Sequence, residues 1–117
     1  MDFRFAVRED TALILRFIKA LAAYEKMSGE VVADEKTLEE WLFDRRKAEV
    51  LFVLEGGEEV GFALFFHNFS TFLGRAGLYL EDLYVREGYR GRGYGKAVLK
   101  KLAAIALERG CGRTAWW

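Results

Sequence analysis

The sequence contains no proline and only one cysteine, Cys111, among its 117 residues. A single cysteine excludes an intrachain disulfide, which suits a reducing compartment. No apolar run approaches the roughly 18 residues that a membrane-spanning helix needs, and the segment Met1–Phe5 lacks the apolar stretch and cleavage pattern of a signal peptide. These absences predict a cytoplasmic protein without a membrane partner.

An excess of charge of either sign is also missing, because 18 basic residues balance 18 acidic ones. The overall charge therefore gives no reason to expect a nucleic-acid partner. One histidine, His67, and one cysteine cannot build a usual transition-metal site, so no metal is expected. Basic residues nevertheless gather between Arg86 and Lys101, which predicts a local cationic site.

Apolar residues are abundant, at 52% with 15% aromatics, and predict a single packed domain over residues 1–117. The residue pattern predicts strands and helices in the order β, α, α, β, β, β, α, β, which indicates an α+β domain with one mixed sheet. Asp10 or Thr11 is expected to cap the first helix. The expected elements are strands at Phe3–Val7, Val50–Leu54, Val60–Phe69, Leu78–Val85 and Arg113–Trp117, and helices up to Tyr24–Glu25, over about Asp34–Phe43 and over Tyr94–Arg109.

The most informative segment is the glycine-rich loop Arg90–Gly95, between a predicted strand and a long predicted helix. Glycines let the main chain approach an anion without a Cβ in the way. Amides at a helix start carry the positive end of the helix dipole and bind phosphate. Arg90, Arg92 and Lys96 add positive charge, so the loop predicts a pyrophosphate cradle.

Three other interpretations of this loop remain open from the residues alone. A Walker loop needs a hydroxyl residue after Gly-Lys, whereas Gly95-Lys96 is followed by Ala97. A dinucleotide-binding fingerprint belongs on the first strand of a parallel unit, with an acidic residue about 20 positions later. An ordinary Gly/Arg turn with no ligand is the third.

The strand before the loop favours one interpretation of the loop over the others. Tyr79–Val85 leads through Arg86-Glu87-Gly88-Tyr89 into the loop, and the whole stretch resembles the central motif of the GNAT superfamily of N-acetyltransferases, whose loop pattern is Arg/Gln-x-x-Gly-x-Gly/Ala. Arg90, Gly93 and Gly95 fill that pattern in order. The Tyr-Leu-Glu-Asp strand and the segment Ala22–Glu25 are similar to the spermidine/spermine (diamine) acetyltransferase branch.

This resemblance implies the GNAT fold, a mixed and mostly antiparallel sheet with helices on both faces. It implies acetyl-CoA as cosubstrate, a polyamine or other small amine as acceptor, and a homodimer. Glu81 matches the carboxylate that acts on the amine, and Tyr24 and Glu25 match positions that line the amine site. The implied coenzyme site consists of Leu83, Tyr84 and Val85 for the pantetheine arm, and of Arg90, Gly91, Arg92, Gly93, Tyr94, Gly95 and Lys96 for the pyrophosphate.

The chemistry of the residues agrees with Glu81 in part. An amine is protonated at neutral pH and must lose a proton before it can attack a thioester, and a carboxylate can accept that proton. Strict alternation places Glu81, Leu83 and Val85 on one face of the strand, and Leu80, Asp82 and Tyr84 on the other. Only one of the two acids would then face a given cleft, and the alternative for either is an ion pair with a neighbouring base.

The chain ends inside its last predicted strand, at Trp117. We expect either a C-terminally truncated chain, without the family's final helix and hairpin and its tyrosine acid, or a natural end in a short edge strand. A truncated chain favours a second hypothesis, a non-catalytic acyl-CoA-binding or regulatory module, and a general nucleotide-binding domain is a third. Trp41, Trp116 and Trp117 are expected in the core or at an interface, and Cys111 as a packed thiol.

Overall fold

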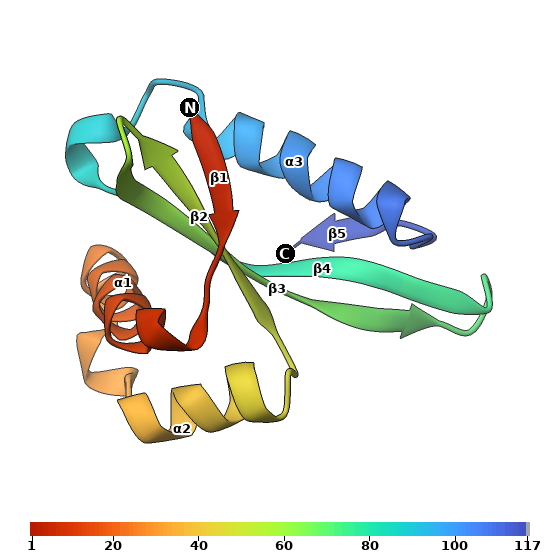
Figure 1. Cartoon of the computed structure of the whole chain (residues 1–117), viewed down its shortest axis with the longest axis horizontal. Coiled ribbons are helices and arrows are strands. Elements are labelled where there is room, and N and C mark those ends of the chain that lie inside the picture. The colour runs from red at the N-terminus through yellow and green to blue at the C-terminus, as the bar shows by residue number, and fades with distance from the viewer. Residues whose placement is uncertain (117) are drawn as a thin grey trace.

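A computed structural model describes residues 1–116, so Trp117 and its predicted place in the last strand lie outside the described residues. The observed element order is the predicted one (Figure 1). The strands are β1 (Asp2–Phe5), β2 (Glu49–Glu55), β3 (Glu58–Ser70), β4 (Arg75–Val85) and β5 (Thr114–Trp116); the helices are α1 (Thr11–Tyr24), α2 (Glu35–Glu39), continued by a π-helical segment over Glu40–Asp44, and α3 (Tyr94–Glu108).

The five strands form one sheet in the order β1-β2-β3-β4-β5. The first three pairings are antiparallel, whereas β4 and β5 run parallel, as a strand pair joined by a crossover helix does. The sheet is therefore mixed and mostly antiparallel, as predicted. β5 is short and pairs only with Leu78–Leu80 of β4.

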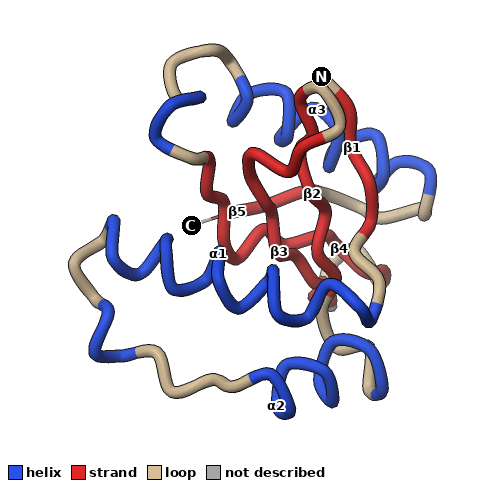
Figure 2. Tube along the Cα trace, turned by 60° about the vertical axis from the view of Figure 1, so that its left-hand side comes forward, coloured by secondary structure: helices blue, strands red, loops and turns tan. Residues whose placement is uncertain are grey.

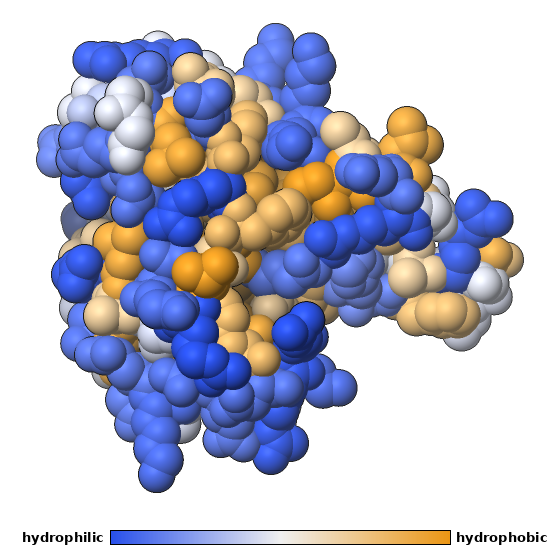
Figure 3. All heavy atoms as spheres, viewed as in Figure 1, coloured by the Kyte–Doolittle hydropathy of each residue, from blue (hydrophilic) through white to orange (hydrophobic). Residues whose placement is uncertain are grey.

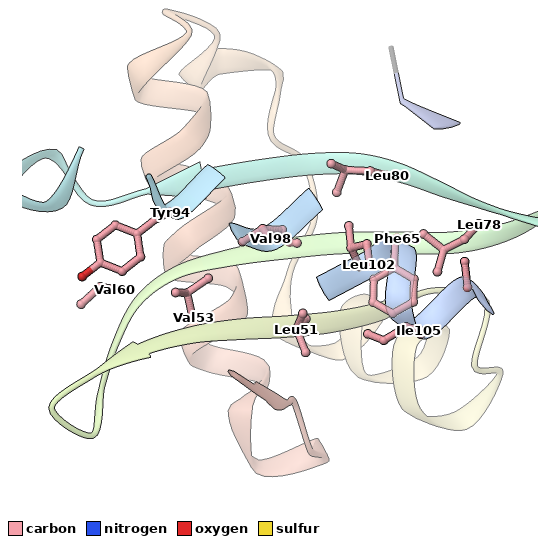
Figure 4. Close-up of a cluster of buried hydrophobic side chains, with 12 residues drawn as sticks. Leu51, Val53, Val60, Phe65, Leu78, Leu80, Tyr94, Val98, Leu102 and Ile105 are labelled. Atoms are coloured by element: carbon pink, nitrogen blue, oxygen red, sulfur yellow. The ribbon is translucent and has the colours of Figure 1, made fainter. Parts of the chain in front are cut away.

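Helices cover both faces of the sheet (Figure 2). On one face α1 and α2 pack over a cluster that includes Ile14, Phe17, Phe52 and Phe62. On the other face α3 packs over a second cluster, which Figure 4 draws with side chains from β2, β3, β4 and α3 pointing toward one another. Leu102 of α3 is fully buried in it. The helical spacing of apolar residues in α1 and α3 accounts for both contacts.

Local sequence explains most element ends. Asp34 caps α2, since its side chain accepts a hydrogen bond from the Thr37 N–H at 2.8 Å. Gly56 and Gly57 have φ of 60° and 82° in the β2–β3 turn, and Gly110 has φ of 73° after α3. The predicted cap of α1 by Asp10 or Thr11 was wrong. The carboxylate of Asp10 accepts from the Val7 N–H and from Arg4, and the Thr11 hydroxyl donates to Arg8 O, so neither side chain caps α1.

The β3–β4 hairpin projects from the body of the molecule, at the right of Figure 1. Its end carries exposed apolar side chains: Phe72 is 99% exposed and Phe69 66%. Figure 3 shows hydrophobic residues on this projecting end, beside hydrophilic ones. Trp41 and Trp116 are also about half exposed, at 48% and 52%, so the prediction that they belong to the core was wrong. An interface role for them stays a prediction.

Candidate functional site

The C-terminal part of β4 is an open sheet edge. β4 has β3 along one side throughout, but within residues 1–116 its other side is paired only at Leu78–Leu80. Within this described part of the chain, residues 81–85 lie beside β3 alone. An unpaired strand edge presents a row of main-chain donors and acceptors to which an extended ligand can bind as an additional strand.

The main-chain groups of Leu83 and Val85 point toward this open side. In an antiparallel pair, successive residues alternate between pointing at the partner strand and away from it. The Arg86 N–H donates to Val60 O of β3 at 2.8 Å, and the carbonyl of Tyr84 also faces β3, where a Cβ on Gly61 would lie 2.7 Å from it. Leu83 and Val85 are the residues that alternate with Tyr84 and Arg86 along the strand, so their N–H and C=O groups face away from β3.

A β-bulge at Glu81 corrects the predicted alternation. Phe65 of β3 lies opposite Leu80, but the next residue back, Leu64, lies opposite Asp82, so β4 holds one extra residue, Glu81. An extra residue shifts the later side chains to the other face. Leu80 consequently shares the α3 face with Leu83 and Val85, whereas Tyr84 packs on the α1 face. The prediction that Leu80 and Tyr84 share a face was wrong, and with it the rule that Glu81 and Asp82 must point opposite ways.

Three carboxylates gather at the bulge. Asp82 is half-buried opposite Leu64 on the α1 face, and Glu81 beside it is exposed. Burial raises the pKa of Asp82 above its ordinary value, and the negative charges of Glu81 and Glu25 raise it further. Glu25 follows α1 directly, so the last turn of that helix lies near the bulge. An acceptor with a raised pKa takes up a proton from an ammonium group more readily.

The glycine-rich loop owes its shape to backbone conformation. Gly91 and Gly93 have φ of 78° and 84°, a region that side-chain-bearing residues rarely adopt. A Cβ on either would meet nothing within 4 Å, so the space in front of the loop is open. At Gly95, a Cβ would lie 3.8 Å from Leu83 Cδ2, which places the start of α3 beside the open edge of β4.

The N-terminus of α3 offers free main-chain donors to this open space. Gly93 precedes the helix and has no side chain to cap it, and the first helical bond is Ala97 N–H to Gly93 O at 3.1 Å. The amides of Tyr94, Gly95 and Lys96 have no acceptor within the helix. Because the helix dipole adds positive potential there, the loop fits the pyrophosphate that the sequence predicts.

The charged side chains of the loop differ in their surroundings. Arg92 and Lys96 are exposed, and among the described residues neither forms an ion pair. The Tyr94 ring is 5% exposed and points into the core (Figure 4), with its hydroxyl donating to Glu55 Oε2 at 2.6 Å. That hydrogen bond raises the pKa of Tyr94, so only the amide of Tyr94 is available to a ligand.

Arg90 turns back from the loop to the end of β4. Its Nε donates to Val85 O at 2.8 Å. Its guanidinium lies 4.1 Å from the ring centre of Tyr24 in α1 and 5.2 Å from that of Tyr84. The two tyrosine rings meet edge to face at 6.4 Å. The sequence pattern assigned Arg90 a free positive charge, and nothing in the pattern indicated this contact with Tyr24.

The remaining candidates lie apart from this edge. His67 is on β3, 3.4 Å from Arg109 Nη1, and Cys111 packs against the α3-side core as a free thiol. A hollow of about 580 Å³ lies between β1, the π-helical segment and β2, but two of its arginines, Arg8 and Arg109, are already paired with carboxylates. Residues 1–116 contain no cluster of His, Cys, Asp or Glu placed to hold a metal, and no helix long and apolar enough to cross a membrane.

Comparison with known proteins agrees with the geometry. Residues 16–117 match the model of the acetyltransferase (GNAT) family. A thialysine N-epsilon-acetyltransferase of Sus scrofa is 40% identical over 94% of this chain and 69% of its own length. A human spermidine/spermine N(1)-acetyltransferase-like protein 1 is 36% identical over 95% of this chain but only 17% of its own length.

A solved structure shares the fold. The ribosomal-protein-alanine N-acetyltransferase of Brucella melitensis biovar Abortus 2308 superposes with a TM-score of 0.81 at 23% identity, over 99% of this chain and 79% of that one. At this identity the likeness concerns the arrangement of strands and helices. The open edge of β4 and the loop before α3 are thus set in a sheet that this acetyltransferase also has.

Proposed function

Since this chain belongs to the GNAT family of acetyltransferases, we propose that it transfers the acetyl group of acetyl-CoA to a primary amine of a small diamine or polyamine. The family assignment carries the reaction type, N-acetyl transfer. The acceptor is suggested by relatives that act on thialysine and by a relative named after spermidine and spermine.

The observation that carries the coenzyme part is the presence of two sets of outward main-chain groups close together, one on the β4 edge at Leu83 and Val85 and one at the start of α3. The N–H and C=O of Leu83 and the N–H of Val85 can pair with the amides of a pantetheine arm as a further strand would, whereas Val85 O already accepts from Arg90. The amides of Gly91–Lys96 can then bind the pyrophosphate at the helix N-terminus. Bound there, acetyl-CoA supplies a thioester whose carbonyl carbon a neutral amine can attack.

The carboxylates at the bulge support the amine part. Glu81, Asp82 and Glu25 provide negative charge that attracts an ammonium group. We propose Glu81 as the proton acceptor, directly or through water, so that the amine nitrogen can form its bond to carbon while the carbon–sulfur bond breaks. The half-buried Asp82 lies next to it and holds the second charge. Tyr24 and Glu25 would form the wall of the amine site.

Two further properties are proposed on the same basis. A homodimer is implied by the family resemblance and is supported by the apolar side chains at the end of the β3–β4 hairpin, which include Phe69 and Phe72. A cytoplasmic location is supported by the single cysteine. Sedimentation of the purified chain tests the dimer, and a monomer at all concentrations would contradict it.

Thiol release measured with acetyl-CoA and each of thialysine, spermidine and spermine tests the proposed function. We expect saturable release with at least one of them, and calorimetry should show coenzyme A binding more tightly than ATP. Coenzyme binding without turnover on any amine would favour the non-catalytic acyl-CoA-binding module instead. Equal affinity for coenzyme A and ATP would contradict the coenzyme assignment itself.

A further inference from the structure

We propose that Arg90 is a positioning residue that transmits coenzyme binding at the loop to Tyr24 on the amine side of the site. The inference rests on the proposed function, because it gives Tyr24 and the loop their two ligands. In this proposal the guanidinium of Arg90 contacts aromatic rings of the protein itself, and it does not bind the phosphates of the coenzyme.

The first step is the connection at the end of β4. The Nε of Arg90 donates to Val85 O, which faces the open side of the strand. That bond satisfies the last outward acceptor of the edge, and leaves the Val85 N–H and both main-chain groups of Leu83 for an extended ligand. Arg90 therefore marks the point at which a ligand must leave the strand edge and turn toward α3.

The second step is the contact with α1. The guanidinium lies 4.1 Å from the ring centre of Tyr24 and 5.2 Å from that of Tyr84, distances at which a cation is attracted to an aromatic face. Tyr84 in turn packs against Phe17 in the α1-side core, with ring centres 6.1 Å apart. Tyr84 is thus the fixed side of the contact. Tyr24 is the last residue of α1 and its side chain is 62% exposed, so Tyr24 is the less constrained partner of the contact.

The third step is the backbone conformation of the loop. Gly91 follows Arg90 directly with φ of 78°, and glycine has a wider choice of backbone angles than any residue with a Cβ. A pyrophosphate bound to the amides of residues 91–96 would fix the loop. Fixing it holds Arg90 against Tyr24 and so orders the wall of the amine site. Coupling of this kind is reciprocal, so a bound amine must strengthen coenzyme binding by the same factor.

Hydrogen exchange of the last turn of α1, residues 20–25, tests the inference without any amine. We expect saturating coenzyme A to protect this turn in the wild-type chain, and to lose that effect in Arg90→Gln although coenzyme A still binds. Tyr24→Phe keeps the aromatic face and should retain the protection, whereas Tyr24→Leu should lose it. Arg86→Gln is the matched control, since Arg86 also stacks on an aromatic ring of α1, that of Phe17, but should leave the effect intact.

Kinetics give the second readout. With acetyl-CoA saturating, the KM for the amine should rise roughly 3- to 10-fold in Arg90→Gln, the range expected for loss of one cation–π contact, with little change in kcat. The double variant Arg90→Gln, Tyr24→Leu should be no worse than either single one.

Three outcomes separate the hypotheses. Failure of the wild-type chain to bind coenzyme A would refute the proposed function. Loss of coenzyme binding in Arg90→Gln, with binding retained in the wild type, would make Arg90 a phosphate-binding residue and overturn the inference. Equal protection of α1 in the wild type and in Arg90→Gln would overturn it as well.

Discussion

The two halves of β4 have different neighbours and different tasks. In the first half β4 is flanked on both sides, by β3 and by the segment that leads into β5, and Leu78 and Leu80 are buried under α3. In the second half, from the bulge to Val85, one side has no neighbouring strand among residues 1–116, and two carboxylates interrupt the apolar pattern. Burial on both sides makes the first half structural, and the missing neighbour makes the second half available to ligands.

The largest expected effect is a loss of activity, without a loss of stability, caused by a substitution in the second half of β4. Glu81→Gln should lower kcat by about 100- to 10,000-fold, the range for loss of a general base, with stability unchanged because Glu81 is exposed. Steady-state kinetics and thermal unfolding measure the two quantities. Asp82→Asn is the companion variant: a much greater loss of kcat there than in Glu81→Gln would transfer the role of base to Asp82.

The next effect is a loss of stability, without a loss of coenzyme affinity, caused by a substitution in the first half of β4. Leu80 is 1% exposed, so Leu80→Ala should lower the free energy of unfolding by about 2 to 5 kcal/mol. The affinity of the folded fraction for coenzyme A should stay the same. Leu83→Ala, at a half-buried position of the second half, should cost less stability. Denaturant unfolding compares them, and an equal loss for both would show that the two halves do not differ in this way.

A smaller effect sharpens the boundary between strand and loop. Gly93 has φ of 84°, where an alanine is strained by about 1 to 2 kcal/mol, so Gly93→Ala should weaken coenzyme A binding by roughly 5- to 30-fold. Gly88→Ala should change it by less than about 2-fold, since Gly88 has an ordinary φ and open surroundings. Calorimetry measures the affinity of both variants for coenzyme A. Equal losses of affinity would argue against the backbone conformation of Gly93 as the cause.

The smallest effect concerns pH. Because the pKa of Asp82 is raised on folding, the folded state binds its proton more tightly than the unfolded state does. This group therefore destabilises the fold as pH rises from its unfolded pKa, near 4, through its raised folded pKa. Asp82→Asn should be more stable than the wild type at neutral pH, and the difference should disappear at acidic pH. Unfolding over a pH series tests this, and a difference that does not depend on pH would contradict it.

The sequence predicted the order of elements, the mixed sheet and the loop before α3, because each depends on local signals: glycine pairs, apolar spacing and a basic glycine-rich stretch. It did not predict the bulge, since an extra residue in β4 is defined only by counting against Leu64 on β3. The missed cap has a similar cause, because Arg4 engages Asp10. The contact of Arg90 with Tyr24 joins residues far apart in the chain, which no local pattern records.

The bulge at Glu81 has a consequence for insertions and deletions. Substitutions at this position leave the main chain as it is, but removing one residue would restore regular alternation through the end of β4. Leu80 and Asp82 would then be direct neighbours opposite Phe65 and Leu64, and Asp82 and Tyr84 would keep the face that they occupy now. A deletion of residue 81 should therefore still fold although it removes the Glu81 carboxylate, and a library that varies both length and residue type would retain folded variants with a codon deletion at position 81.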